Sequence, residues 1–159
     1  MKTHTLIRRI RAGFLWLALG LFSLSVGTAL RAASREATLQ AIHEIENPRN
    51  LPTPGRRGEL GAYQFRYATW KMHTDIPFYR AVDKSVSDVI AVRHYEWLKR
   101  GLERARLPAS PYNIALAWNS GLAATVAGRS PRVAHRYAER ARNLADEFDR
   151  SGAGRVAMR

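Results

Sequence analysis

Two glutamates near the end of a helical pattern are the residues in this sequence best placed for acid–base chemistry. They lie in the stretch HEIENPRN, His43 to Asn50. Because a helix turns by about 100° per residue, Glu46 falls on the same face as Leu39 and Ile42, whereas Glu44 points outward. A carboxylate on an apolar face has its charged form disfavoured, so its pKa rises, as a general acid near neutral pH requires. The alternative is that the helix ends at Glu46 and its side chain is solvated.

Three later segments add weight to the interpretation of Glu46 as a catalytic acid. They read GELGAYQ from Gly58, ALAWNSG from Ala115 and YAERA from Tyr137. With Glu46, they resemble the catalytic domain of the soluble lytic transglycosylases, in the lysozyme-like superfamily, over about residues 38–145. That family has a glutamate, a glycine-containing segment that leads to glutamine, an Ala-x-Tyr-Asn-Ala-Gly motif and a late tyrosine. The matching positions here are Glu46, Gly58, Gly61, Gln64, Asn119, Gly121 and Tyr137.

The sequence also departs from the family pattern. Asn47 stands where the family usually has a serine that supports the carboxylate. Trp118 replaces the motif tyrosine, which an aromatic pocket wall should tolerate, and Ser120 replaces alanine. The segment GAYQFRYATW is also similar to the resuscitation-promoting-factor branch of the superfamily, but that branch normally carries cysteines and this chain has none.

The resemblance implies an enzyme that cleaves the β-1,4 bond between N-acetylmuramic acid and N-acetylglucosamine in peptidoglycan. Glu46 would protonate the glycosidic oxygen, then accept the proton of the muramoyl 6-hydroxyl as that oxygen closes a 1,6-anhydro ring. Glycines at positions 58 and 61 let the backbone run close to a substrate. The substrate-binding residues expected from this interpretation are Gly58, Gly61, Tyr63, Gln64, Trp118, Asn119 and Tyr137. Core packing is the alternative for the aromatic residues among them, and for Trp70.

Three other functions stay open. A hydrolytic lysozyme on the same scaffold needs a second carboxylate, and Glu59, Asp75 and Asp83 are the only candidates in the middle of the chain. No motif surrounds them, so we interpret them as solvated loop charges. A non-catalytic peptidoglycan-binding protein is favoured only by the change at Asn47. A nucleic-acid binder would fit the charge of the chain but not an export segment.

Composition limits the remaining choices. The chain has 159 residues, no cysteine and a formal net charge of +13. Such a surface favours polyanions, including the acidic polymers of a cell wall. The five histidines are scattered, and no phosphate-binding loop is present, so we expect no metal and no cofactor. We expect peptidoglycan glycan strands as the partner, no nucleic acid, and a monomer.

The N-terminus predicts export. Basic residues at positions 2, 8, 9 and 11 precede residues 12–30, which contain no charged side chain. This pattern is typical of a signal peptide or, if uncleaved, of a membrane anchor through residues 12–30. We therefore expect a periplasmic or other cell-envelope location, with inner-membrane anchoring as the second option. The expected domains are 1–33 as signal or anchor, 34–148 as the lysozyme-like domain and 149–159 as a flexible tail.

Hydrophobic spacing and capping residues place the candidate residues on helices. Helical patterns cover 34–46, 63–72 and 85–106, with a capping box expected at Ser85 and Asp88. Serine–proline pairs predict helix starts at Ser110 and Ser130. Prolines and glycines between residues 48 and 58 predict a loop. The predicted fold is mainly α: a single domain of about five helices with at most a small hairpin around 55–61.

Overall fold

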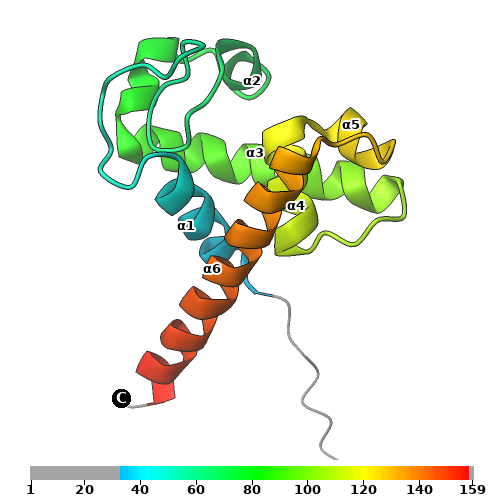
Figure 1. The fold of residues 1–159 in the computed structure, drawn as a ribbon. Coiled ribbons are helices and arrows are strands. Elements are labelled where there is room, and N and C mark those ends of the chain that lie inside the picture. The colour runs from blue at the N-terminus through cyan, green and yellow to red at the C-terminus, as the bar shows by residue number, and fades with distance from the viewer. Residues whose placement is uncertain (1–32, 158–159) are drawn as a thin grey trace, which may run out of the picture. The chain divides into compact units, whose positions relative to one another are not determined.

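The protein is almost entirely helical over the residues that its structure, a computed structural model, describes: 33–157, with side chains to residue 152. These residues belong to one compact unit, and the signal or anchor predicted for residues 1–33 lies outside them apart from Ala33. No helix among them is both long and apolar enough to cross a bilayer. Figure 1 shows the order α1 (Arg35–Glu46), α2 (Tyr67–Lys71), the 3₁₀ helix η1 (Phe78–Val82), α3 (Lys84–Arg104), α4 (Pro111–Ser120), α5 (Leu122–Val126) and α6 (Arg132–Ala157).

The mainly α prediction is confirmed. Within the described part of the chain there is no strand. Where a small hairpin was expected, around 55–61, the chain forms a turn closed by a hydrogen bond from Gly55 N–H to the Glu59 carbonyl, and an isolated antiparallel bridge joins Leu60 and Phe65 just after it. Two predicted helix starts are also confirmed. The Ser34 hydroxyl accepts the backbone N–H of Ala37 at 3.2 Å, and the Ser110 hydroxyl accepts that of Asn113 at 3.3 Å.

Helix α3 lies at the centre of the main core. Its side chains at Ile90, Leu98 and Leu102 are fully buried against residues from α1, α2 and α4, among them Ile42 and Trp70. Burying one such side chain stabilises the fold by about 1.5–3 kcal/mol. Because residues of α1 and α4 pack into the same core, the end of α1 at Glu46 and the end of α4 at Ser120 have fixed positions.

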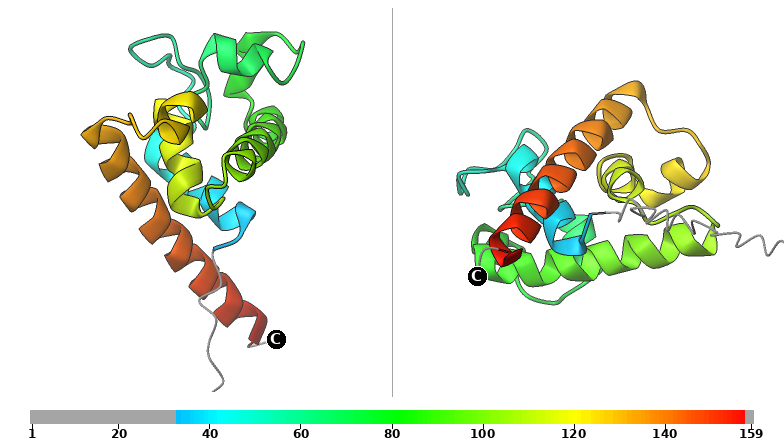
Figure 2. Two further views of the ribbon diagram at one scale, coloured as in Figure 1. Left: turned by 90° about the vertical axis from the view of Figure 1, so that its right-hand side faces the viewer. Right: turned by 90° about the horizontal axis from the view of Figure 1, so that it is seen from below.

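Helix α6 packs on α1 and α4 through a stripe of alanines (Figures 1 and 2). Ala134, Ala138, Ala141 and Ala145 recur at three- and four-residue spacing, and all are fully buried. Ala138 and Ala141 share a cluster with Ala115 and Leu116 of α4, and Ala145 shares one with Ala37 and Ala41 of α1. Small side chains on both surfaces let the helices approach closely, and this brings Tyr137 of α6 towards α1.

The second predicted helix starts later than expected. It begins at Tyr67, not Tyr63, because residues 60–65 form a tight turn closed by two backbone hydrogen bonds between Leu60 and Phe65, at 2.9 and 3.0 Å. Gln64 has φ +46° in this turn, a left-handed conformation that a right-handed helix excludes. Tyr63 and Phe65 are both buried in the core, which holds the turn in place.

Three other boundaries are corrected. The N-cap of α3 is Asp83, whose carboxylate accepts the N–H of Ser85, so Ser85 lies inside the first turn. Ser130 does not cap α6, because its hydroxyl hydrogen-bonds that of Ser120 at 2.8 Å. The backbone of α6 stays helical to Ala157, beyond the boundary expected at 148, since no proline interrupts it and each added residue gains a hydrogen bond. Helices η1 and α5 were not predicted.

Among the described glycines, Gly61 leaves the least room for a Cβ, and a substitution there should be severe. A Cβ on Gly61 would overlap the carbonyl oxygen of Ala81, and its φ is +78°. Gly58 has nearly the same φ, +77°, with nothing within 4 Å of its Cβ position. We expect Gly61→Ala to lower the free energy of unfolding by about 3 kcal/mol or more, and Gly58→Ala by only about 1 kcal/mol. Chemical denaturation of both variants measures the difference, and equal losses would show that the contact with Ala81 is unimportant.

Candidate active site

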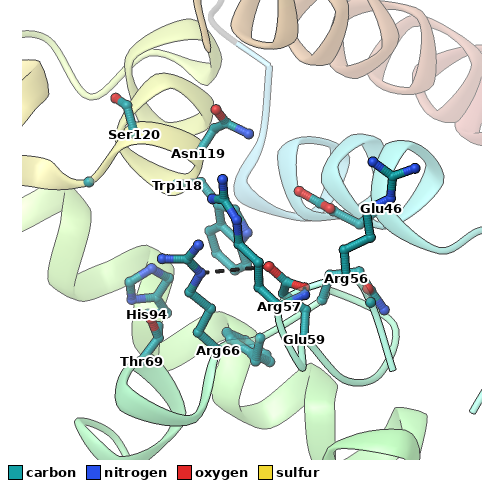
Figure 3. Close-up of a pocket in the computed structure, with 14 residues that line it drawn as sticks. Glu46, Arg56, Arg57, Glu59, Arg66, Thr69, His94, Trp118, Asn119 and Ser120 are labelled. Carbon is teal, nitrogen blue, oxygen red and sulfur yellow. Dashed lines mark hydrogen bonds and ion pairs between the residues drawn. The ribbon is translucent and has the colours of Figure 1, made fainter. Parts of the chain in front are cut away.

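A cavity of about 590 Å³ lies where the end of α1, the loop 55–66 and the end of α4 meet. Figure 3 shows Glu46 and Arg56 on one side of it, Trp118 and Asn119 on another, and Arg57 between them. Its lining is strongly polar apart from Phe65 and the ring of Trp118. The lining residues are Glu46, Gly55, Arg56, Arg57, Glu59, Gln64, Phe65, Arg66, Thr69, His94, Trp118, Asn119, Ser120 and Gly121.

Glu46 is the last residue of α1 and is half-buried, whereas Glu44 is exposed, so the helical-phase prediction for this pair is confirmed. The Tyr137 hydroxyl of α6 donates a hydrogen bond of 2.8 Å to Glu46 Oε1. Burial raises the pKa of Tyr137 well above its ordinary value, and the negative charge of Glu46 adds to the shift. Tyr137 therefore keeps its proton and can act only as a donor to this carboxylate near neutral pH.

The environment of Glu46 favours its protonated form. Burial raises the pKa of Glu46 above its ordinary value, the hydrogen bond from Tyr137 offsets part of this rise, and the charge of Glu59 adds to it. Its position at the negative end of the α1 dipole acts in the same direction. A carboxyl group with these surroundings can hold a proton at a higher pH than an exposed glutamate and release it to a bound substrate.

Asn47, which departs from the family serine, closes the loop behind Glu46. Its side-chain amide donates to the carbonyl oxygens of Leu51 at 2.9 Å and Gly61 at 3.2 Å. Its side-chain oxygen accepts the N–H of Leu51 at 3.0 Å. Asn47 is buried and does not line the cavity. It thus fixes the chain that leaves α1 and links it to the segment that carries Gln64.

Glu59 lies in the same cavity, although the sequence analysis interpreted it as a solvated loop charge. Its Oε2 accepts the backbone N–H of Arg57 at 2.9 Å, and its Oε1 lies 3.7 Å from Nε of Arg66. Burial is the largest single influence and acts to raise the pKa of Glu59. Hydrogen bonds from the backbone N–H groups of Arg57 and of Glu59 itself, together with the charges of Arg66 and Arg57, outweigh it, so the net shift of the pKa is downward. The cavity thus holds one carboxyl group whose pKa is raised and one whose pKa is lowered.

Of the predicted substrate-binding residues, three line the cavity with Glu46: Gln64, Trp118 and Asn119. The Gln64 side-chain amide donates to the Gly61 carbonyl at 3.0 Å, which orients its side-chain oxygen. Asn119 is exposed at the end of α4. Trp118 is half-buried: it packs against the core and has its ring centroid 4.7 Å from that of His94 while also lining the cavity. Trp118 therefore contributes both to core packing and to the wall of the cavity, the two roles considered for it from the sequence.

Four predicted substrate-binding residues do not line the cavity. Tyr137 reaches it only through its hydrogen bond to Glu46, and the other three are Gly58, Gly61 and Tyr63. Gly58 supports a turn through its positive φ, and Gly61 packs against the backbone of Ala81. Tyr63 is only 5% exposed, and its hydroxyl donates to Asp88 at 2.8 Å. The geometry thus gives these residues roles in packing and turn formation, and it gives Trp70, fully buried with its indole N–H on the Ile76 carbonyl, a core role.

Several residues that line the cavity were not predicted from the sequence as site residues. Arg56 and Arg57 lie between Gly55 and Gly58, and that glycine pair could have indicated a turn that presents them. Glu59 lies just before the segment that leads to Gln64, which was also a usable signal. His94 is different: it comes from the buried face of α3, and nothing in its neighbourhood in the sequence marks it.

Comparisons with protein-family models, with curated proteins and with solved structures found no match to this chain. The family resemblance therefore depends on the residues of this chain alone.

The buried carboxyl group should leave a pH-dependent signature in stability. The folded pKa of Glu46 lies above its ordinary value of 4.5, so its ionisation costs stability only as the pH rises above 4.5 and through the folded pKa. We expect Glu46→Gln to unfold at a higher denaturant concentration than the parent at pH 7 and to show no such gain at pH 4. Glu44→Gln, in the same helix but exposed, should show no gain at either pH. A gain for Glu46→Gln of equal size at both pH values would contradict the assignment.

Proposed function

We propose that this protein is an exported enzyme that cleaves the β-1,4 bond between N-acetylmuramic acid and N-acetylglucosamine in peptidoglycan, as a lytic transglycosylase. One observation carries the proposal: Glu46 is half-buried at the wall of a polar cavity and accepts a hydrogen bond from Tyr137. Gln64 and Asn119 line the same cavity. These four residues come from separate parts of the chain, and all belong to the motifs on which the family resemblance depends.

In the proposed reaction, Glu46 does both proton transfers. Its carboxyl group protonates the glycosidic oxygen as the bond to the anomeric carbon breaks. The resulting carboxylate then accepts the proton of the muramoyl 6-hydroxyl while that oxygen bonds to the anomeric carbon, which gives the 1,6-anhydro product. Tyr137 holds Oε1 throughout, and this leaves the other carboxyl oxygen for the proton transfers. The side chains of Gln64 and Asn119 offer amide groups to sugar hydroxyl and N-acetyl groups.

Hydrolysis is the second candidate, and Glu59 specifically favours it. An inverting or retaining glycosidase uses two carboxyl groups, one protonated and one ionised, on either side of the bond. Glu46 and Glu59 line one cavity and have pKa values shifted in opposite directions. In this candidate Glu46 is the acid, and ionised Glu59 activates a water or stabilises positive charge at the anomeric carbon.

Activity should depend on Glu46 and not on its neighbour Glu44. Glu46→Gln keeps the size of the side chain and its acceptor for Tyr137 but removes the transferable proton. General acid–base groups contribute about 10²–10⁴-fold to rate, so we expect release of soluble fragments from purified peptidoglycan to fall at least about 10²-fold. Glu44→Gln should keep most of the activity. A dead Glu44→Gln and a live Glu46→Gln would contradict the proposal.

Glu59→Gln distinguishes the two reactions. If the 6-hydroxyl is the nucleophile, mass spectrometry of the released fragments should still find anhydro ends. Removal of the Glu59 charge should also lower the pKa of Glu46, so the falling limb of the pH–rate profile should move to lower pH. If Glu59 activates a water, the parent should give reducing ends, and the variant should lose about 10²–10⁴-fold of its rate. Anhydro ends from the parent would exclude the hydrolytic candidate.

A further inference from the structure

Arg56 and Arg57 occupy the centre of a turn held at both ends by backbone hydrogen bonds. Gly58 N–H donates to the Gly55 carbonyl at 3.0 Å, and Gly55 N–H donates to the Glu59 carbonyl at 2.8 Å. Gly58 has φ +77°, as in a short hairpin loop that ends in a glycine bulge. The Glu59 carboxylate accepts the N–H of Arg57 and adds a third restraint. The backbone that carries the two arginines is therefore largely fixed before any ligand binds.

Arg56 and Arg57 line the cavity, and their guanidinium groups have no hydrogen-bonded or ion-paired partner among the described residues. Among the described residues, neither side chain forms a hydrogen bond or an ion pair within 4.0 Å, and both arginines are exposed. Arg66, the third arginine of the cavity, is engaged with Glu59. Figure 3 shows Arg56 and Arg57 extending from the loop along the cavity that holds Glu46. The Glu59 carboxylate interacts electrostatically with Arg57 and is paired with Arg66. One carboxylate does not balance three arginines, so this part of the cavity keeps positive charge that an anionic group of a ligand can neutralise.

We propose that Arg56 and Arg57 form a binding subsite for carboxylate groups carried by an acidic glycan, so that the protein prefers carboxylate-bearing strands to neutral ones. This inference deepens the proposed function and rests on it for the polymer. A guanidinium group pairs with a carboxylate through two parallel hydrogen bonds. Because the backbone of the turn is already restrained, the conformational entropy lost on pairing is that of the arginine side chains and not of the loop. The subsite lies in the same cavity as Glu46, so a bound carboxylate also sets the register of the strand relative to the proposed acid.

A binding assay with purified peptidoglycan tests the subsite, and the full chain carries Glu46→Gln so that it does not cleave the polymer. The probes are purified peptidoglycan and the same peptidoglycan with its carboxylates converted to amides, pelleted at one salt concentration. We expect amidation to weaken binding by about 10-fold, which is about 1.4 kcal/mol shared between two guanidinium–carboxylate pairs, as is typical of exposed pairs of good geometry. Adding R56Q and R57Q should weaken binding to native peptidoglycan by a similar factor and remove the difference between the two polymers.

The matched control is Arg49→Gln with Arg129→Gln, which removes the same charge from exposed arginines that do not line the cavity. It should keep the preference for native over amidated polymer. The proposal is overturned if R56Q/R57Q leaves that preference intact or if the control removes it equally. It is also overturned if the chain does not bind native peptidoglycan, or if duplex DNA competes for binding better than soluble acidic glycan fragments do. Cleavage by the chain with Glu46 intact is assayed separately: failure there refutes the enzymatic proposal, whereas the binding ratio decides the subsite.

Discussion

The hydrogen bond from Tyr137 to Glu46 joins residues 91 positions apart and depends on how closely α6 can approach α1. Fully buried alanines on α6 set that approach, because larger side chains at these positions would push the helices apart. The bond has two effects on Glu46. It satisfies one carboxyl oxygen in a partly buried place, and it limits how far burial can raise the pKa. The packing of a long helix is thus coupled to the protonation of a single side chain at the cavity.

The predictions from the sequence that the structure confirms are those in which a local pattern determines the conformation. Ser110 caps its helix as predicted, the first helix begins next to Ser34 where helical spacing was expected to begin, and the burial of Glu46 against the exposure of Glu44 follows directly from helical phase. Likewise, Gln64 and Asn119, which were chosen by the order of the motifs, line the cavity, and Tyr137 donates a hydrogen bond to Glu46. In these cases the physical cause acts within a few residues of the side chain concerned, or the motif itself encodes the long-range contact.

The predictions that were wrong concern residues whose conformation depends on contacts with other segments. The second helix was expected to begin at Tyr63, but the backbone hydrogen bonds between Leu60 and Phe65 and the burial of Tyr63 require a turn over these residues. Ser130 has the sequence of a cap, but its hydroxyl finds Ser120 from another helix. Glu59 has no motif around it. Its place in the cavity follows from the turn before it, where a Cβ on Gly55 would lie only 2.6 Å from Glu59 Oε2 and 2.8 Å from Gln64 Oε1.

The two carboxyl groups of the cavity differ only in what surrounds them. Glu46 is partly buried at the end of a helix, receives one tyrosine hydroxyl and faces the negative end of the helix dipole, so it keeps its proton to a higher pH than an exposed glutamate does. Glu59 follows a turn that offers a backbone N–H and nearby arginines, so its proton is lost more readily. Because the turn that orients Glu59 also presents Arg56 and Arg57, a change in that turn would alter the charge of the cavity and the field at Glu46 together. The pKa of Glu46 and the positive charge of the cavity are therefore linked through one short loop between α1 and α2.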